Sequence, residues 1–444
     1  MRAGAPALPA LSSPFILDRA PFTCFLHPEL LLARKVVLDL LSFCQTNFIS
    51  IDFAWKFSRF IKMASTRILI TGGAGFIGSR LARELQRDGG HVVVLDNLLP
   101  QVHGSNPQPD LPECETIWAD VRDRDALDRA MKGVEIVHHF AAETGVGQSQ
   151  YEIARYVSVN TYGTALVLEA AAEAGVRQVV IASSRAVYGE GTFACARCGQ
   201  SFAAAGRSSQ LMDAGRFDIY CPQCGAAAQP SLMSESTPAN PISIYGLTKY
   251  QQEQLAQQVS AINDLETTIL RFFNVYGPGQ SLKNPYVGVL GTFFRRASAD
   301  ETIEVYEDGQ MSRDFVFVGD VVEALHLATN NEAAFGQIMN VGSGEALTLF
   351  EVASQMFRAL GKEPQIKVSG RYRSGDIRHA VAAISRLEQQ LGFVPRTSFA
   401  DGLQSFVDWA RENQVDTADD LAAQELASRH LLRQAALTEK SVLE

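Results

Sequence analysis

The stretch that decides the fold is Thr71-Gly72-Gly73-Ala74-Gly75-Phe76-Ile77-Gly78. It follows a short apolar run at 67–70, which is typical of a buried strand, and leads into 79–85, where apolar side chains recur at helical spacing. A glycine turn between a strand and a helix lets the backbone approach a pyrophosphate, which the helix N-terminus can then bind. The next apolar run ends in Asp96, where a carboxylate can hold a ribose hydroxyl. The sequence therefore predicts a dinucleotide-binding unit.

The composition is that of a large folded protein. With 444 residues, 46% of them hydrophobic and 20% charged, the chain can bury a large core. Its net charge of −10 argues against a nucleic-acid or anionic-membrane partner. It contains no run of about 18 uncharged apolar residues, so we expect no transmembrane helix. Seven cysteines without a secretory signal predict reduced thiols and a cytoplasmic location.

Strand and helix patterns alternate from residue 67 to about residue 190, which predicts an α/β fold with a Rossmann-type doubly wound parallel sheet. We expect a dinucleotide-binding Rossmann domain at 64–270, a cysteine-containing insertion within it at 190–238, a smaller mixed α/β substrate-binding domain at 271–412 and a helical tail at 413–444.

Residues 1–63 form an atypical N-terminal extension. Met63 lies directly before the first predicted strand, so we expect it to be the native start and the preceding residues to be translated upstream sequence. The alternative is a targeting or membrane-associating extension.

A tyrosine and a lysine predict a catalytic base. The stretch Tyr245-Gly246-Leu247-Thr248-Lys249 places a phenol and an ammonium on one face of a helix. A neighbouring lysine favours the phenolate by lowering its pKa, which produces a general base. Alone, this spacing is common in surface pairs. Here Ser184 ends an earlier apolar strand, and its hydroxyl could reach the same substrate oxygen.

Two Cys-x-x-Cys pairs, Cys195/Cys198 and Cys221/Cys224, lie within the insertion, with 22 residues between them. Four thiolates in two such turns can surround Zn²⁺ tetrahedrally, as in a zinc ribbon, so we predict a structural zinc. Redox-active thiols and coincidence are the alternatives. The charged residues between Cys195 and Cys224 sum to +1, too little for a nucleic-acid-binding ribbon.

The chain resembles the extended short-chain dehydrogenase/reductases, in particular the NAD-dependent nucleotide-sugar epimerases and dehydratases. The resemblance covers roughly residues 66–412 and rests on TGGAGFIG (71–78), HHFAAETGV (138–146), Asn160, SSRAVYG (183–189), YGLTK (245–249), RFFNVYGPGQ (271–280), SRDFVFVGD (312–320) and RSGD (373–376).

The resemblance implies a role for each matching residue. The catalytic residues would be Ser184, Tyr245 and Lys249. NAD would be bound by Gly72, Gly75, Phe76, Ile77, Gly78, Asp96, Asn97, Asp120, Val121, Ala141, Ala142, Asn160, Tyr245 and Lys249. The sugar nucleotide would be bound by Ser184, Asn274, Arg313 and Arg373, with the two arginines on the diphosphate. For each arginine, a solvated surface charge is the alternative.

The resemblance also narrows the set of reactions that the protein could catalyse. Dehydratases and decarboxylases of this family carry an acidic residue shortly after the catalytic Ser/Thr, whereas this chain has Arg185 and Ala186. What remains is epimerisation at C4: Tyr245 takes the proton of the 4-hydroxyl while NAD takes the hydride, and the hydride returns to the other face of the 4-keto sugar. Arg185 departs from the small residue that is usual at this position.

With its insertion, the chain resembles a subgroup assigned as dTDP-L-rhamnose 4-epimerases, which interconvert dTDP-L-rhamnose and dTDP-6-deoxy-L-talose. An alternative is a 4-epimerase of UDP-glucose, UDP-N-acetylglucosamine or UDP-glucuronate. A catalytically idle NAD-binding regulatory protein is an alternative from another class. The resemblance further implies a homodimer that pairs through the Tyr245 helix and the helix before it.

Overall fold

The computed structural model describes residues 63, 66–282, 284, 288–413 and 421–436, and the expectation for the N-terminal extension therefore falls outside the described residues. Within those ranges, no helix is both long enough and apolar enough to cross a membrane.

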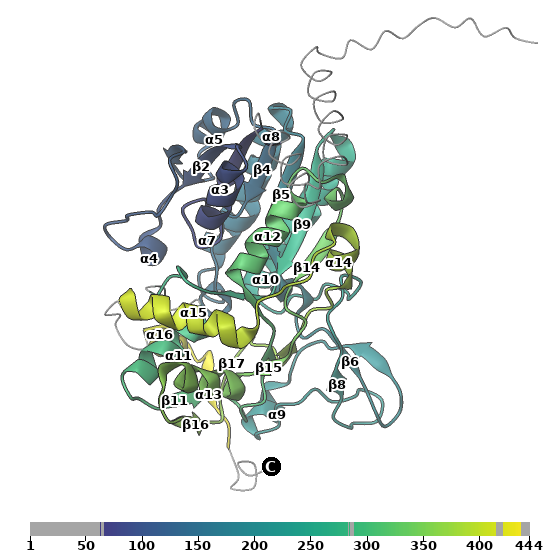
Figure 1. The fold of residues 1–444 in the computed structure, drawn as a ribbon. Helices are drawn as coiled ribbons and strands as arrows, with labels where there is room; N and C mark the ends of the chain where they lie inside the picture. The colour runs from purple at the N-terminus through teal and green to yellow at the C-terminus, as the bar shows by residue number, and fades with distance from the viewer. Residues whose placement is uncertain (1–62, 64–65, 283, 285–287, 414–420, 437–444) are drawn as a thin grey trace, which may run out of the picture. The chain divides into compact units, whose positions relative to one another are not determined.

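A seven-stranded parallel sheet forms the centre of the fold (Figure 1). Its strand order is β14-β9-β5-β4-β1-β2-β3. The bounds are β1 (Arg67–Thr71), β2 (His91–Asp96), β3 (Glu115–Trp118), β4 (Ile136–His139), β5 (Gln178–Ser184), β9 (Glu266–Phe272) and β14 (Ile338–Val341). Because β1 pairs with β2 on one side and with β4 on the other, the strand order reverses there, and such a reversal opens a crevice at the carboxyl ends of the strands. The predicted Rossmann-type fold is confirmed.

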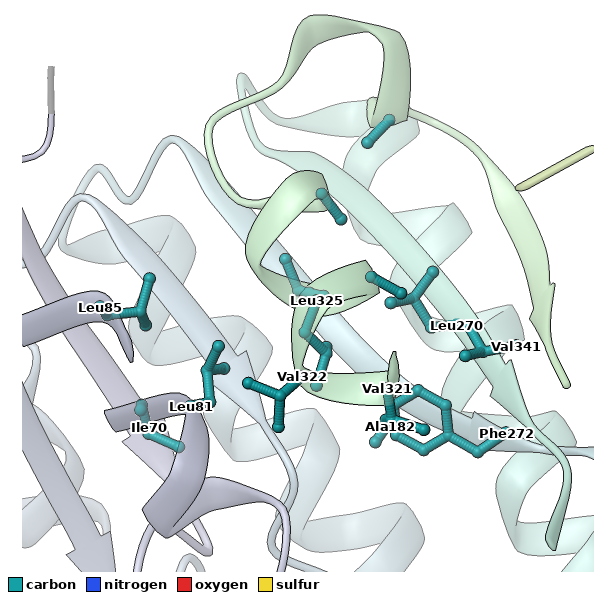
Figure 2. Close-up of a cluster of buried hydrophobic side chains, with 14 of the residues drawn as sticks. Ile70, Leu81, Leu85, Ala182, Leu270, Phe272, Val321, Val322, Leu325 and Val341 are labelled. Carbon is teal, nitrogen blue, oxygen red and sulfur yellow. The ribbon is translucent and has the colours of Figure 1, made fainter. Parts of the chain in front are cut away.

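Helices cover both faces of the sheet, and each face has its own apolar core. On one face lie α3 (Gly78–Arg87), α12 (Val318–Ala328) and α14 (Ser385–Leu391). Figure 2 shows how Leu81 and Leu85 of α3 approach Val322 and Leu325 of α12 above the strands. The other face is covered by α5 (Arg124–Ala130), α8 (Gly163–Glu173) and α10 (Ile244–Ile262). Both layers consist of β-branched and aliphatic side chains, as expected for a sheet that is buried on both faces.

Shorter elements connect the sheet to its loops. They are α4 (Pro100–His103), α6 (Val146–Ser149), α7 (Ile153–Tyr156), the π-helix η1 (Val157–Tyr162), and the 3₁₀ turns η2 (Arg185–Tyr188) and η3 (Glu332–Ala334).

The second part of the chain is a mixed α/β region. Its strands form three small sheets, β10 (Asn274–Tyr276) with β13 (Phe315–Phe317), β11 (Ile303–Val305) with β16 (Ile366–Val368), and β12 (Ser312–Arg313) between β15 (Leu347–Thr348) and β18 (His379–Ala380). A phenylalanine-rich core joins these strands to α11 (Val289–Ser298), α13 (Leu349–Leu360) and α15 (Phe399–Glu412).

The cysteine-containing insertion folds as a small unit in the connection from β5 to α10. It contains a three-stranded sheet and one short helix, α9 (Ser209–Asp213); the strands are β6 (Thr192–Ala194), β7 (Ser201–Ala203) and β8 (Gln229–Pro230). The central strand β6 pairs with both others in antiparallel fashion. Phe193, Ala204, Ile219 and Ala228 form a separate small core.

The C-terminal segment is more than the helical tail that the sequence predicts. It contains the helix α16 (Leu421–Ser428) and then the strand β19 (Leu432–Gln434), which pairs in antiparallel fashion with β17 (Arg371–Arg373). The tail therefore folds back against the strand that contains Arg373. A three-residue strand with this composition has no distinctive periodicity of its own, and its partner strand is 60 residues away, so the sequence pattern does not reveal the pairing.

Candidate active site

A cavity opens at the carboxyl ends of β1, β2 and β4, where the strand order reverses. Eight of the residues predicted to bind NAD line it: Gly72, Gly75, Asp96, Asn97, Asp120, Val121, Ala141 and Ala142. They come from four different loops, and the parallel sheet brings them to one edge. The position is the one at which doubly wound folds bind dinucleotides.

The glycine turn has the shape that a pyrophosphate site requires. Gly72 has a φ of +69°, which favours glycine, and a Cβ on Gly78 would lie 2.5 Å from the carbonyl oxygen of Gly72. Only a glycine at 78 therefore allows α3 to begin directly against the turn. This close approach fits bound NAD, because a helix N-terminus beside a glycine turn favours a pyrophosphate.

Asp96 is buried, and its position is fixed by two backbone hydrogen bonds. Its carboxylate accepts one from the N–H of Ala74 at 3.0 Å and one from the N–H of Leu98 at 2.8 Å. Asp120 accepts hydrogen bonds from Arg122, which lower the pKa of its carboxyl group. Two fixed carboxylates at this edge suit the hydroxyls and the amino group of an adenosine.

Four of the predicted NAD-binding residues do not line the cavity. Phe76 and Ile77 pack against the core beneath α3, and Gly78 begins that helix. The fully buried amide of Asn160 donates to the carbonyl of Glu143 and to the hydroxyl of Thr248, both at 3.0 Å. In this structure Asn160 connects the cavity loop to α10.

Ser184, Tyr245 and Lys249 converge at the end of β5. Ser184 is the last residue of that strand, and its hydroxyl interacts with the phenol of Tyr245 and lowers the pKa of that phenol. Tyr245 lies in the first turn of α10, where its backbone N–H donates to Ser149 at 3.1 Å. Lys249 lies one turn further along the helix, and its ammonium donates to the carbonyl of Ala182 at 2.8 Å. The structure thus brings together the three residues that the sequence predicts as catalytic.

The phenol of Tyr245 lies in a buried and charged environment. Burial raises the pKa of Tyr245, whereas the interaction with Ser184 and the positive charge of Arg185 lower it. Burial also lowers the pKa of Lys249 to about 7. The positive charge of Arg185 is thus a second influence on the phenol, beside the Lys249 that the sequence pattern predicts. A spacing of four residues places two side chains on one face of a helix but does not specify their hydrogen-bond partners.

A buried ion pair holds α10 against the sheet. Arg271 of β9 donates to Glu253 of α10 through two nitrogens, Nε at 2.9 Å and Nη2 at 2.6 Å, and the hydroxyl of Ser183 binds the same carboxylate. The Arg271 guanidinium also lies 4.7 Å from the ring centre of Tyr188. Two parallel hydrogen bonds to one carboxylate fix orientation as well as distance.

A second cavity lies between the sheet and the mixed α/β region, and it contains the predicted substrate residues Asn274, Arg313 and Arg373. The buried Oδ1 of Asn274 has no hydrogen-bond partner among the described residues. The charged lining residues are five arginines and two carboxylates, a net of +3; they are Arg185, Arg296, Arg313, Arg371 and Arg373 with Glu304 and Asp376. Such an excess of positive charge suits a ligand with several negative charges.

Sequence reasoning did not identify several residues of this second cavity. Arg296 lies on α11 and Ala423 on α16, and neither belongs to a recognisable motif. Arg371 lies two residues before Arg373, so the alternation of a strand places both side chains on one face of β17. That alternation is the only signal in the sequence that could have identified it.

The four predicted metal-ligating thiols meet in the insertion. Their sulfur atoms all lie within 4.8 Å of one another, with Cys195 and Cys224 at 3.5 Å and Cys198 and Cys221 at 3.6 Å. Tetrahedral Zn²⁺ with Zn–S bonds of about 2.3 Å places its sulfurs about 3.8 Å apart, so the thiols fit this ion.

Both cysteine pairs also have the same backbone geometry. In each pair the first cysteine accepts a hydrogen bond from a glycine in the left-handed region, Gly199 (φ +73°) or Gly225 (φ +70°). Two matched turns that direct four thiols to one point form a metal-binding arrangement.

Comparison with known proteins agrees with this geometry. The model of the NAD dependent epimerase/dehydratase family matches residues 68–201 and 221–342. The chain belongs to this family. The 19 residues between the two matched segments (202–220) lie between the two cysteine pairs, so the centre of the insertion is additional to the common family pattern.

Three similar proteins lie within or near the family's nucleotide-sugar branch. A dTDP-L-rhamnose 4-epimerase from Burkholderia thailandensis is 36% identical over 349 residues, which cover 77% of this chain and 94% of the relative. A putative UDP-glucose 4-epimerase from Methanocaldococcus jannaschii is 30% identical, covering 78% of this chain and 99% of the relative. The structure of MoeE5 in complex with UDP-glucuronic acid and NAD has a TM-score of 0.63 and 31% identity, covering 78% of this chain and 99% of MoeE5.

The protein is therefore an NAD-dependent enzyme of the epimerase/dehydratase family, as its sequence predicts.

Proposed function

We propose that this protein is a nucleotide-sugar 4-epimerase that acts on dTDP-L-rhamnose and forms dTDP-6-deoxy-L-talose. The observation that carries the proposal is the convergence of Ser184 and Tyr245 at the end of β5, where the next residue, Arg185, lines the second cavity with four other arginines. The sugar ring would lie at the junction, and its diphosphate would lie among the arginines.

The residues supply the proton chemistry. Tyr245 would remove the proton of the 4-hydroxyl, and Ser184 would hold the same oxygen through its hydroxyl. The positive charge of Arg185 stabilises the phenolate that this step requires. NAD, held by the residues of the first cavity, would supply the hydride acceptor and donor that inversion at C4 of the sugar requires. The substrate is then released with inverted configuration and without net oxidation.

The pocket favours epimerisation over dehydration. Elimination of water needs a carboxylic acid near the 4-keto sugar, but the residues that follow Ser184 are Arg185 and Ala186. Glu304 forms an ion pair with Arg371 at 3.0 Å, and Asp376 faces the positive charges of Arg185 and Arg313. Both pocket carboxylates therefore face guanidinium groups, and neither lies next to Ser184 in the sequence.

Two observations support dTDP-L-rhamnose over a UDP-hexose. The relative with 36% identity is a dTDP-L-rhamnose 4-epimerase. The second cavity also has apolar lining from Val289, Phe293, Met311 and Leu349, which suits the methyl groups of thymine and of a 6-deoxy sugar. The UDP-sugar alternatives stay within the same mechanism.

We further propose that the four thiols hold a structural zinc ion and that the protein is a homodimer. Free thiols at this spacing need a reducing compartment, which fits the expected cytoplasmic location. The dimer is supported by apolar side chains that remain exposed on α7, η1 and α10: Ile153 (48% exposed), Val157 (40%), Tyr162 (55%) and Leu247 (40%).

Incubation with dTDP-L-rhamnose should yield dTDP-6-deoxy-L-talose in proton NMR spectra, with little turnover of UDP-glucose, UDP-N-acetylglucosamine or UDP-glucuronate. Tyr245→Phe should lower kcat at least about 100-fold, because it removes the general base. Tyr162→Phe, which alters an exposed phenol, is the control. Turnover of a UDP-sugar alone would refute the substrate, and full activity of Tyr245→Phe would refute the mechanism. Absence of turnover with all four substrates would favour the idle regulatory protein.

Arg185→Met should move the acidic limb of the kcat/KM profile upward by roughly one pH unit, because it removes a positive charge that lowers the pKa of Tyr245. The neighbouring Lys249, Ser184 and Tyr156 remain in place. The control is Arg373→Met, which should raise KM at every pH without moving the limb. An unchanged limb in Arg185→Met would show that the arginine does not act on the base.

Elemental analysis should find about one zinc ion per chain. Cys221→Ser should lose the ion and lower the Tm, because it removes one of four ligands that hold the two turns together. Cys114→Ser, whose thiol lies outside the insertion, should keep the full zinc content. A metal-free wild-type protein would refute the proposed zinc site.

Sedimentation velocity should give the mass of two chains. Leu247→Glu should yield single chains, because it places a charge in the proposed apolar interface. Ile262→Glu, at the exposed far end of α10, should remain dimeric. A single-chain mass for the wild-type protein would contradict the dimer.

A further inference from the structure

A buried network of charged residues joins the cysteine-containing insertion to the substrate-binding region. Arg207 of the insertion forms ion pairs with Glu190 at 2.9 Å and with Glu307 at 2.7 Å. Glu307 also pairs with Arg378 at 2.9 Å. Both arginine side chains are 3% exposed, and both glutamates are fully buried. Glu307 therefore lies between a guanidinium from the insertion and one from the substrate-binding region.

Arg378 has further partners on both sides of this junction. It binds Asp308 at 2.6 Å and Asp218 of the insertion at 2.9 Å, and its backbone N–H donates to Glu190 at 2.7 Å. We call Glu190, Arg207, Asp218, Glu307, Asp308 and Arg378 the buried network. Its members come from three segments that are far apart in the sequence.

The buried network binds the backbone of residues 376–378, and this backbone accepts hydrogen bonds from Arg313. The guanidinium of Arg313 donates to the carbonyl of Ile377 at 2.7 Å and to that of Arg378 at 3.1 Å. Arg207 also donates to the carbonyl of Asp376, at 2.8 Å. Residues 376–378 are thus bound on one side by the insertion and on the other by Arg313, which lines the second cavity.

A second contact from the insertion reaches Arg373. Met212 and Phe217 pack against Tyr372, whose hydroxyl donates to Asp213 at 2.6 Å. Tyr372 is the middle residue of β17, and its neighbours Arg371 and Arg373 both line the second cavity. The insertion therefore supports two of the arginines expected to bind a diphosphate.

Buried charges tolerate little displacement. A buried ion that loses its partner is strongly destabilised. The segments that carry the buried network can therefore move only as one unit. The insertion, in contrast, has a small core of its own and two turns that meet at the four thiols. A metal ion at those thiols would determine whether Arg207 and Asp218 hold their positions.

We propose that Arg207 and Asp218 are positioning residues that couple metal binding in the insertion to diphosphate binding in the second cavity. Loss of the metal would displace the two residues, release segment 376–378 and leave Arg313 with only one of its three carbonyl partners, that of Ser312. The proposal rests on the proposed nucleotide-sugar function. It makes the metal a determinant of substrate affinity as well as of stability.

The test measures the Kd of dTDP and of UDP by calorimetry, with zinc and NAD content determined on the same samples. Arg207→Met should retain zinc and NAD but bind both nucleotides at least about fivefold more weakly. The factor should be equal for the two, because Arg313 would contact the diphosphate and not the base. In turnover assays the KM should rise while kcat stays within about twofold.

Cys221→Ser should lose zinc and weaken dTDP binding by a similar factor. The double variant Arg207→Met/Cys221→Ser should bind dTDP no more weakly than either single variant, because both changes disrupt the same series of contacts between the insertion and Arg313. Asp218→Asn changes a half-exposed side chain and should also weaken dTDP binding. It is the alternative variant for the test if Arg207→Met does not fold. The control is Arg216→Met, which removes an exposed guanidinium that stacks on Tyr220 and should change nothing.

Normal dTDP binding by zinc-loaded Arg207→Met and Asp218→Asn would refute the coupling, as would additive losses in the double variant. A wild-type protein that binds neither dTDP nor UDP would refute the proposed function, and this proposal with it.

Discussion

The pair between Arg271 and Glu253 is the interaction on which the proposed chemistry depends. It joins the strand β9 to the helix α10 in the buried interior, and the hydroxyl of Ser183 in β5 binds the same carboxylate. Two strands and one helix are thereby held in a fixed register. Because Tyr245 lies two turns before Glu253 on α10, the register also sets the distance from its phenol to Ser184. Replacing one partner would leave an unpaired charge in the core, which costs about 3–5 kcal/mol.

The arrangement separates binding of the cofactor from binding of the second ligand. The cavity beside β1 is lined by a glycine turn and by carboxylates. Backbone N–H groups hold the carboxylate of Asp96 in place. The neighbouring cavity is built from side chains, five of them arginines on short strands and helices. The first depends on the twist and order of a large sheet, whereas the second depends on smaller elements that vary more easily. The base at the start of α10 serves both.

The sequence was most informative where one local requirement determines the residue. The glycines at 72, 75 and 78 are needed for a tight turn whatever surrounds them, and alternating apolar runs indicate the parallel sheet directly. The four thiols were predictable for the same reason, since their spacing is itself the signal. The hydrogen bond of Lys249 to Ala182, the influence of Arg185 on the phenol and the presence of Ala423 in the second cavity were not predictable. Each depends on how segments far apart in the sequence pack together, which no local pattern records.

The two ends of the cysteine-containing insertion lie side by side. The N–H of Ser231 donates to the carbonyl of Thr192 at 2.9 Å, and β6 pairs with β8 just beyond. A segment that leaves and re-enters the chain at one point can be acquired in a single genetic event without disturbing the sheet. Removing it is a different matter. Deletion of residues 192–231 would leave Glu190 and Glu307 in the interior without the guanidinium of Arg207 that pairs with both. Acquisition is thus structurally easy, but reversal would require compensating changes in a distant segment, and lineages that have come to depend on the insertion should retain it.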